Sequence, residues 1–270
     1  MTQAAARITC GAVKSVVAVG VDSMSNVPLL FRKRFGEKLL KLSKAKTAGQ
    51  KLSGVAKFRP GDFAPLIGLK LGLTDPVSDL MMGDTAEKLA REYGISREDQ
   101  DQFAVWSHAK TVEAWKEGRL SDETMTLYPQ PKSEALEQDI GPRDGQSMEA
   151  LGKMKPYFDR KWGTVTVGNS CGVTDGAAAL LLMEADYADS LGLQPIGRIR
   201  STEFAGCDPS RMGLGPVYSS AKALKSAGMT MDDIDLVELN EAFAAQVLAC
   251  LKGFESPPED CMDSDASARL

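Results

Sequence analysis

Two stretches of the chain change character in the same way, and they restrict the fold more than any other feature. Residues 164–183 (TVTVGNSCGVTDGAAALLLM) and 236–254 (LVELNEAFAAQVLACLKGF) each begin with a strand-like segment and continue into a run of small and apolar residues. The first part predicts a strand, and the second predicts a helix, which in the later stretch begins at Asn240. Such strand–turn–helix units indicate an α/β fold with a mainly parallel sheet.

Other segments extend this alternation of strands and helices. The apolar run SVVAVGV at residues 15–21 predicts a buried strand, and GRIRSTEFAG at residues 197–206 predicts another. Helical spacing and capping residues predict helices over residues 84–94 and 96–118, each ending at a glycine. We expect the long polar and basic middle of the chain to be an insertion in this fold.

Composition excludes several functional classes. The 270 residues are 43% hydrophobic and 26% charged, which is typical of a globular protein, and the net charge of −5 offers no polycation for nucleic acid. Five cysteines, an odd number without CxxC spacing, argue against a disulfide framework or a metal site and favour a reducing compartment. No apolar run approaches about 18 residues and no signal-peptide cleavage site follows the N-terminus, so we expect a cytoplasmic protein.

Three places carry side chains that can do chemistry. His108, the only histidine, lies in a predicted helix without a partner motif, and we interpret it as a partly buried or surface helical residue. The Asn240–Glu241 pair at a strand-to-helix junction predicts either a site that orients water or an oxyanion, or a simple helix N-cap. The glycine-rich turn at residues 168–176 lets a ligand approach the backbone, and a tight turn explains it equally well. Cys171 in that turn is a candidate nucleophile on local grounds.

Six segments in a fixed order carry a family resemblance. They read VDSMSNVP, MGDTAEKLA, SREDQDQFA followed by SH, KMKPYFDRKWGTVTVGNSCGVTDGAAALLLM, MGLGPVYSSAKAL and DIDLVELNEAFAAQ. This order resembles that of the thiolase family, the acyl-CoA C-acyltransferases, over nearly the whole chain from Ala4 to Gly253. The segment AKTAGQKLSGVAKFRPGDFAP, residues 45–65, further resembles the branch that contains the β subunit of the fatty-acid β-oxidation complex.

The resemblance implies a layered αβαβα fold of two similar halves, here incomplete, with a loop domain inserted in the first half. We expect residues 1–22 to be the tail of the N-terminal half and residues 23–165 to be the loop domain. Residues 166–192 would then complete the N-terminal half, residues 193–254 would begin the C-terminal half, and residues 255–270 would form an acidic tail.

The resemblance also assigns roles to five residues. Asn240 of NEAFAAQ matches the catalytic Asn that holds a water in the oxyanion hole, and Phe243 matches a residue that lines the pantetheine channel. Arg143 of GPRDGQS matches the Arg that contacts the nucleotide end of coenzyme A, and Met82 would lie near the thioester. Cys171 stands where relatives have a Ser that bonds pantetheine, and because a thiol is a poorer donor, that bond would be weakened. By this match Cys171 is not the nucleophile.

The resemblance places the nucleophilic Cys of thiolases before the first residues of this chain, and the catalytic His and the acid/base Cys beyond Phe254. We therefore expect an internal fragment in which Cys10 is an ordinary buried or helix-end residue. The implied reaction converts a 3-oxoacyl-CoA and coenzyme A to acyl-CoA and acetyl-CoA, or runs as the reverse condensation, with coenzyme A as substrate and no tightly bound cofactor. The chain alone is expected to be inactive, and the alternative is a non-catalytic pseudo-subunit that binds coenzyme A.

Residues 32–59 raise the question of partners, because they hold ten Lys or Arg against one acid, Glu37. A solvated basic face accounts for this excess, and so does attraction to coenzyme A phosphates, an acidic partner subunit or an anionic membrane surface. By family, we expect a homo-oligomer or a partner subunit of β-oxidation, with no nucleic acid and with peripheral membrane contact through this segment.

Overall fold

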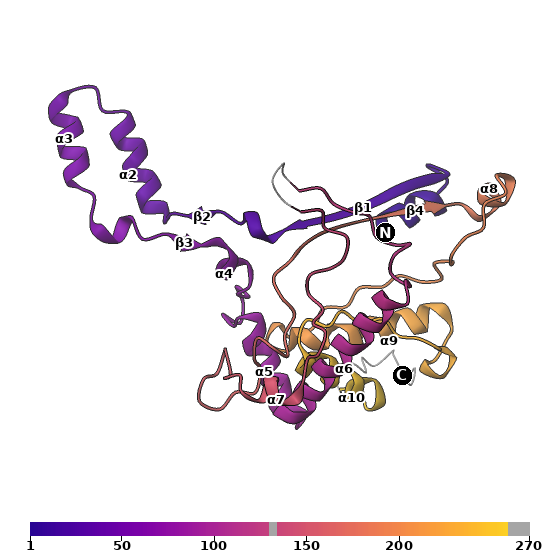
Figure 1. The fold of residues 1–270 in the computed structure, drawn as a ribbon. Coiled ribbons are helices and arrows are strands. Elements are labelled where there is room, and N and C mark those ends of the chain that lie inside the picture. Colours follow the sequence, from indigo (N-terminus) through magenta and orange to yellow (C-terminus); the bar gives the residue numbers. More distant parts are fainter. Residues whose placement is uncertain (130–133, 259–270) are drawn as a thin grey trace. The chain divides into compact units, whose positions relative to one another are not determined.

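A computed structural model describes residues 1–129 and 134–258 of the chain (Figure 1). The chain divides into two compact units. One, here called the core unit, comprises residues 1–17, 82–172 and 181 onward; the other, the hairpin unit, comprises residues 18–81 and 173–180. Most of the predicted acidic tail, with Cys261, lies outside the described residues.

The core unit is built on four longer helices and one 3-10 helix that pack together. These are α5 (Met82–Glu92), α6 (Arg97–Lys116), η3 (Pro209–Leu214), α9 (Gly215–Ala227) and α10 (Ala244–Glu255). Buried apolar side chains of α5, η3, α9 and α10, together with those of two loop residues, form a single cluster: Ala86, Leu89, Ala90, Ile95, Val165, Leu214, Val217, Tyr218, Ala245, Ala249, Cys250 and Phe254. The helices predicted over residues 84–94 and 96–118 are thereby confirmed to within a few residues.

Local sequence sets the ends of these helices. Ser96 begins α6 with a capping box, in which its side chain accepts the Asp99 N–H and the Asp99 carboxylate accepts the Ser96 N–H. Gly228 ends α9 in the left-handed conformation that glycine adopts without strain. The shorter elements of this unit are α1 (Thr2–Thr9), α7 (Met148–Gly152), α8 (Ala185–Ser190) and η4 (Met231–Asp233).

The hairpin unit contains two consecutive helices, α2 (Lys33–Ser43) and α3 (Ala48–Ala56), which pack against each other. Short antiparallel strands β2 (Leu29–Leu30) and β3 (Leu66–Ile67) flank them. Neither helix has a buried residue. Stacked and edge-on contacts join four phenylalanines at the base of the helices: Phe31, Phe35, Phe58 and Phe63. The remaining elements are η1 (Met24–Asn26), η2 (Pro60–Asp62) and α4 (Gly68–Gly72).

The strand assignments need correction. The predicted strand at residues 15–21 is present as β1 (Ser15–Ser23), but the predicted helix after the GNSCG turn is instead strand β4 (Asp175–Met183), which pairs with β1. Hydrogen bonds join Glu184 to Lys14 at one end and Asp175 to Ser25 at the other, so the two strands run in opposite directions. Pairing with β1 overrides the helix preference of the Ala–Leu run, because tertiary context outweighs propensity.

The apolar run of β1 is also less buried than predicted. Val17, Val19 and Val21 are all exposed on this two-stranded sheet. The segments predicted as strands at residues 197–206 and 236–239 are extended or irregular, because no described strand pairs with them. Within residues 1–129 and 134–258, no helix is both long and apolar enough to cross a bilayer.

Candidate functional site

The glycine-rich GNSCG turn (residues 168–172) and the NEAFAAQ segment (residues 240–246) come together in the core unit through backbone pairing. Ser170 and Phe243 form an antiparallel bridge. The Cys171 N–H donates to the carbonyl oxygen of Ala242 at 2.9 Å, and the Ala244 N–H donates to that of Asn169 at 3.0 Å. The GNSCG turn and the NEAFAAQ segment are therefore held side by side, and Cys171 and Phe243 lie on the paired segments.

This pairing changes where the last helix begins. Helix α10 starts at Ala244 and not at Asn240, and Phe243 is its N-cap residue. Phe243 has extended backbone angles, φ −146° and ψ 138°, because it is part of the bridge to Ser170, and a helix cannot pass through it. The interpretation of Asn240 as a simple N-cap is therefore wrong. Asn240 lies in an exposed turn before the bridge, and its carbonyl oxygen accepts the Ala242 N–H at 3.0 Å.

Aromatic contacts connect this pair of segments to Met82. The Phe243 ring meets the Phe158 ring edge-on at 6.1 Å between centroids. Phe158 in turn covers Gly83, where any Cβ would overlap the ring, so the position next to Met82 must be glycine. Met82 is the first residue of α5 and is half-buried. The structure thus brings the MGDTAE, KPYFDRKWG and NEAFAAQ segments to one region.

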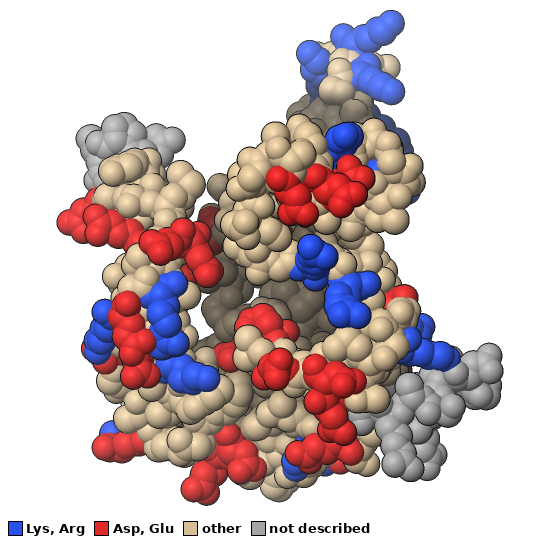
Figure 2. All heavy atoms as spheres, turned by 90° about the vertical axis from the view of Figure 1, so that its right-hand side faces the viewer, with Lys and Arg blue, Asp and Glu red and all other residues tan. Residues whose placement is uncertain are grey.

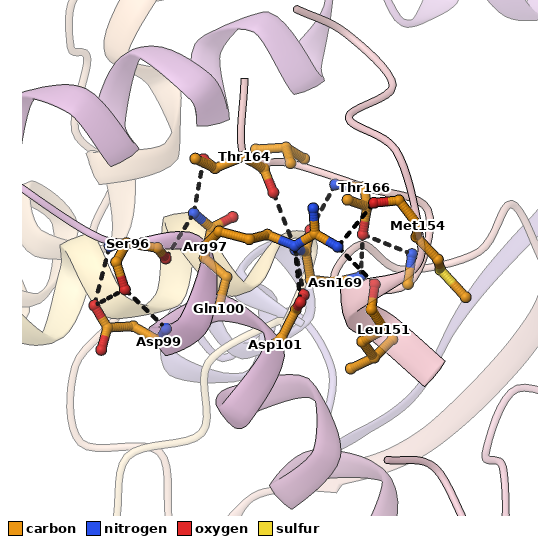
Figure 3. A network of polar contacts seen from close by, with 12 residues as sticks. Ser96, Arg97, Asp99, Gln100, Asp101, Leu151, Met154, Thr164, Thr166 and Asn169 are labelled. Atoms are coloured by element: carbon orange, nitrogen blue, oxygen red, sulfur yellow. Dashed lines mark hydrogen bonds and ion pairs between the residues drawn. The ribbon is translucent and has the colours of Figure 1, made fainter. Parts of the chain in front are cut away.

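A buried polar network connects the GNSCG turn to helix α6 (Figure 3). The Asp101 carboxylate, only 2% exposed, accepts hydrogen bonds from Arg97 Nε at 2.8 Å and from Asn169 Nδ2 at 2.9 Å. Asn169 Oδ1 accepts the Thr166 N–H at 2.8 Å. The side chain of Asn169 therefore bonds to α6, and its backbone carbonyl oxygen bonds to the first residue of α10.

Figure 3 shows the same network reaching other segments from the first turns of α6. The Arg97 guanidinium donates to the carbonyl oxygens of Leu151 at 2.6 Å and Met154 at 3.0 Å. The Gln100 amide donates to Thr164 Oγ1 at 2.9 Å. Sequence reasoning missed these positioning residues. The available signal was that Arg97, Gln100 and Asp101 share one helix face at i, i+3 and i+4 behind a capping box.

A second buried carboxylate holds the strand-like segment before the turn. Glu87, 2% exposed, accepts the Thr164 N–H at 2.9 Å and the Val165 N–H at 2.9 Å. A Cβ on Gly163 would overlap the Glu87 carboxylate, which explains a glycine there. Charge-assisted hydrogen bonds of this kind substitute for the sheet partner that this segment lacks among the described residues.

Arg143 lies on a separate loop against α6. Gly145 gives this loop its turn, with a positive φ of 74°, and Lys116 on α6 pairs with Asp144 at 3.1 Å. Between the loop and the helix is an open cavity of about 480 Å³. It is lined by Val105, Ala109, Val112, Glu113, Lys116, Arg143, Asp144, Gly145 and Gln146. Arg143 itself is exposed and lines this space, which is large enough for part of a ligand.

His108 is half-buried, as expected, yet it also contacts the Arg143 loop. Its Nδ1 accepts the backbone N–H of Arg143 at 3.3 Å. Burial lowers the pKa of His108 below its ordinary value of 6.5, and the charge of Arg143 lowers it further, against an opposing effect of Glu241. Ser107, the preceding residue, donates its hydroxyl hydrogen to the Glu241 carboxylate.

The thiols of Cys171 and Cys250 lack the environment of a nucleophile. Cys171 is exposed, and desolvation by neighbouring atoms raises the pKa of its thiol. Burial in the core raises the pKa of Cys250 to about 11, and its Sγ donates to the carbonyl oxygen of Gly213 at 3.1 Å. Cys10 is exposed at the C-terminal end of α1. A raised thiol pKa leaves little thiolate at neutral pH, the reverse of what a nucleophile needs.

The five predicted site residues therefore fall into two groups within the core unit. Phe243, Cys171 and Asn240 share the paired segments, and Met82 joins them through Phe158. Arg143 belongs to the cavity against α6 and connects to the first group through the contacts of Ser107 and His108. Among residues 1–129 and 134–258, no cluster of His, Cys, Asp or Glu side chains is arranged to hold a metal ion.

Comparisons with known proteins show the family to which the chain belongs. The N-terminal domain model of thiolases matches residues 1–186, and the thiolase C-terminal domain model matches residues 193–262. A 3-ketoacyl-CoA thiolase of Pectobacterium carotovorum is 43% identical over 250 residues, which cover 92% of this chain and 56% of the relative. One from Klebsiella pneumoniae is 41% identical over 263 residues, covering 97% of this chain and 58% of the relative. The chain thus spans little more than half the length of these relatives.

Solved structures give the same result. Acetyl-CoA acetyltransferase of Bacillus anthracis matches with a TM-score of 0.80 and 34% identity, over 94% of this chain and 60% of that one. Human mitochondrial 3-ketoacyl-CoA thiolase in complex with CoA matches with a TM-score of 0.78 and 32% identity, over 93% of this chain and 58% of that one. The layered α/β fold expected from the sequence motifs is therefore shared with these structures. The chain belongs to the thiolase family.

Proposed function

We propose that this chain carries the coenzyme A-binding surface and the Asn-bearing loop of an acyl-CoA C-acyltransferase. In this reaction coenzyme A would cleave a 3-oxoacyl-CoA to give acyl-CoA and acetyl-CoA, or the reverse condensation would run. The observation that carries this proposal is the backbone pairing of residues 169–171 with residues 242–244. It holds the two segments that bear Cys171 and Phe243 in one place, as binding of a single pantetheine arm requires.

Each predicted residue has a role that fits its position. The exposed amide of Asn240 would hold a water that donates to the oxyanion or enolate as it forms. Phe243 and Met82 would line the path of the pantetheine arm and the thioester, with Cys171 as a weak donor beside them. Arg143, exposed at its cavity, would pair with the phosphates of the nucleotide end. Coenzyme A is a substrate in this proposal and not a resident cofactor.

Calorimetric titration of the purified 270-residue chain with coenzyme A tests this binding. We expect Arg143→Ala to weaken binding by about tenfold or more, because a charged hydrogen bond to phosphate contributes roughly 1.5–3 kcal/mol. Lys153→Ala is the matched control, since Lys153 is an exposed cation that pairs with Glu149. Equal affinity of both variants for coenzyme A, or no binding by the unaltered chain, contradicts the proposal.

Catalysis by the 270-residue polypeptide on its own is a separate question. Cys171 and Cys250 have raised thiol pKa values, and His108 uses Nδ1 to accept a backbone N–H. We therefore expect no thiolysis of acetoacetyl-CoA by this polypeptide alone. Turnover that survives Cys171→Ala would overturn the site assignment, and turnover lost with that change would make Cys171 the nucleophile. Binding without turnover is the result expected of this proposal, and it also fits the second candidate, a non-catalytic subunit that binds coenzyme A.

The division of the chain into thiolase parts is also proposed. We place the tail of the N-terminal half at residues 1–22, the loop domain at 23–165, the rest of that half at 166–192 and the start of the C-terminal half at 193–254. Support comes from the boundary between the two family models, which falls between residues 186 and 193. Limited proteolysis would test the division, with cuts expected near these boundaries.

The exposed sheet supports assembly with a second copy or with a β-oxidation partner. Val17, Val19 and Val21 of β1 and Leu181 of β4 are exposed, and such apolar sheet surfaces associate with other chains. We expect light scattering to find oligomers. A monomer that melts cooperatively would count against assembly through this sheet.

The helices α2 and α3 support a further role at an anionic membrane. Their Lys and Arg side chains gather at the top of Figure 2. Leu39, Leu40 and Leu52 are exposed beside them, which combines apolar and basic groups as an interfacial helix does. We expect binding to anionic vesicles at low salt that weakens at high salt. Equal binding to anionic and neutral vesicles, or none to either, would leave a solvated basic face as the explanation.

A further inference from the structure

Two adjacent residues of α6 contact two different loops of the candidate site. Ser107 donates its hydroxyl hydrogen to Glu241 of the NEAFAAQ segment. His108 accepts the backbone N–H of Arg143 through Nδ1 at 3.3 Å. One turn of a rigid helix therefore sets the position of the Asn-bearing loop and that of the Arg143 loop at the same time.

We propose that His108 is a positioning residue for coenzyme A binding, which holds the Arg143 loop while its imidazole is neutral and releases it on protonation. The proposal rests on the proposed function, because Arg143 is the residue assigned there to the nucleotide phosphates. It adds a residue and a dependence on pH that the assignment itself does not contain. His108 acts through Arg143 and does not need to touch the ligand.

The hydrogen bond defines the protonation state that can hold the loop. Nδ1 accepts a hydrogen bond only when the ring is neutral and its proton is on Nε2. A protonated ring has N–H groups at both nitrogens, so the Arg143 N–H would face a donor and lose its acceptor. The added positive charge would also repel the Arg143 guanidinium.

Three influences act on the charge of His108. Burial against its neighbours and the Arg143 charge favour the neutral ring, whereas the Glu241 carboxylate favours the protonated one. Together they lower the pKa of His108, so the ring is neutral at pH 7 and the loop is held. The Lys116–Asp144 ion pair is a weaker hold on the same loop, since both side chains are mostly exposed.

Two substitutions separate a positioning role from a packing role. His108→Asn places an amide oxygen close to the position of Nδ1, so it keeps an acceptor that cannot titrate. His108→Phe keeps an aromatic ring and removes the acceptor. The affinity for coenzyme A would be measured by calorimetry from pH 8 to pH 5 for the unaltered chain and for both variants, with Lys153→Ala as the exposed control.

We expect the unaltered chain to lose about five- to tenfold more affinity for coenzyme A between pH 8 and pH 5 than His108→Asn does, the equivalent of one hydrogen bond. The ligand's own phosphate monoester also titrates near pH 6, but that change is common to all variants and cancels in the comparison. His108→Phe should bind about five- to tenfold more weakly than the unaltered chain at pH 8. Parallel pH profiles for the unaltered chain and His108→Asn would overturn the proposal.

Hydrogen exchange of the Arg143 amide distinguishes failure of this inference from failure of the proposed function. If the unaltered chain does not bind coenzyme A at pH 8, the proposed function fails, but the amide still reports the His108 contact. At pH 5, we expect the Arg143 amide to be less protected in the unaltered chain than in His108→Asn. At pH 8, the amide should be equally protected in both proteins. Equal protection of the two proteins at both pH values overturns the role of His108 whether or not coenzyme A binds.

Discussion

The core unit and the hairpin unit hold their helices in different ways. In the core unit, α5, α9 and α10 bury apolar side chains in one cluster, and the site segments rest on that cluster. In the hairpin unit, α2 and α3 have no buried residue and depend on phenylalanine contacts and on Asp62. Each unit nevertheless contains a carboxylate that is almost fully covered, Asp101 in one and Asp62 in the other. Among the described residues, the core unit alone adds buried apolar side chains to its covered carboxylate, so the two units differ in packing and not in this polar contact.

The largest effect should come from the apolar core. Leu89→Ala removes a fully buried side chain of α5, and we expect it to lower the free energy of unfolding of the core unit by about 3–4 kcal/mol. The matched change in the hairpin unit, Leu40→Ala, removes a side chain that is 62% exposed and should cost less than about 0.5 kcal/mol. Denaturant unfolding followed by tryptophan fluorescence measures the first value.

Tryptophan is a selective probe here, because Trp106, Trp115 and Trp162 all belong to the core unit. The Leu40→Ala variant therefore needs far-UV circular dichroism as a second readout for the hairpin unit. Similar losses of stability for the two leucine variants would show that α2 is buried in the protein in solution, for instance against a second chain.

The second effect in size concerns the polar network of the core unit. Asp101→Ala leaves the Arg97 guanidinium and the Asn169 amide without their shared acceptor, and we expect a loss of about 3 kcal/mol. Glu98→Ala on the same helix is the control, because Glu98 is exposed. Hydrogen exchange at the Cys171 and Ala244 amides should also accelerate in Asp101→Ala. Unchanged protection of these two amides would show that the pairing of the site segments does not depend on the polar network.

The sequence was sufficient for the features that local chemistry determines. Helices with capping signals, such as α6 behind Ser96, occur where predicted, and the motifs around Phe243 and Cys171 lie together in the core unit. The start of α10 could not be predicted, because Phe243 is extended only through its bridge to Ser170, about seventy residues earlier in the chain. Long-range pairing of this kind leaves no periodic signal in either segment.

The same limit explains two other differences. Residues 175–183 combine Ala and Leu in a pattern that suits a buried helix as well as a strand, and only the presence of β1 beside them decides for β4. Asp101 and Asn169 both lie in motif segments, but neither segment indicates that their side chains meet, because polar side chains are usually exposed and only the fold reveals this contact. The role of His108 was hidden for the same reason: its partner, the Arg143 backbone, is contributed by a distant loop.

A smaller effect compares the same local device in both units. Ser96 begins α6 and Thr47 begins α3 with the same kind of capping box, so Ser96→Ala and Thr47→Ala should each cost about 1 kcal/mol locally. The consequences should differ. Helix α6 has 20 residues and tertiary contacts, whereas α3 has 9 residues, fewer than the roughly 12–15 that an isolated helix needs.

We therefore expect Thr47→Ala to reduce the helical signal of the hairpin unit at 25 °C, and Ser96→Ala to lower only the unfolding midpoint of the core unit. Amide exchange at Gln50 and Asp99, the residues that each cap bonds, measures the local change. Loss of helix in the core unit with Ser96→Ala would mean that tertiary packing of α6 contributes less than the buried network suggests.

The smallest effect should be the response of the two units to acid. The two units should lose stability in different pH ranges. The hydrogen bond from Lys38 and the backbone N–H of Arg59 hold the pKa of Asp62 below its ordinary value of 3.8. Its stabilisation of the hairpin unit is therefore present above pH 3.8 and is lost as the pH falls through the lower, folded-state pKa.

In the core unit, the lowered pKa of His108 makes the folded state resist a proton that the unfolded chain accepts, so stability declines as the pH falls below 6.5. We expect the stability monitored by tryptophan fluorescence to begin falling near pH 6.5 in the unaltered chain, and to fall less in His108→Asn. The helical signal of the hairpin unit should persist in the unaltered chain until below pH 3.8. In Asp62→Asn, that signal should already be reduced at neutral pH. A single transition shared by both probes at one pH would mean that the two units unfold together, and that their different ways of holding helices have no separate energetic consequence.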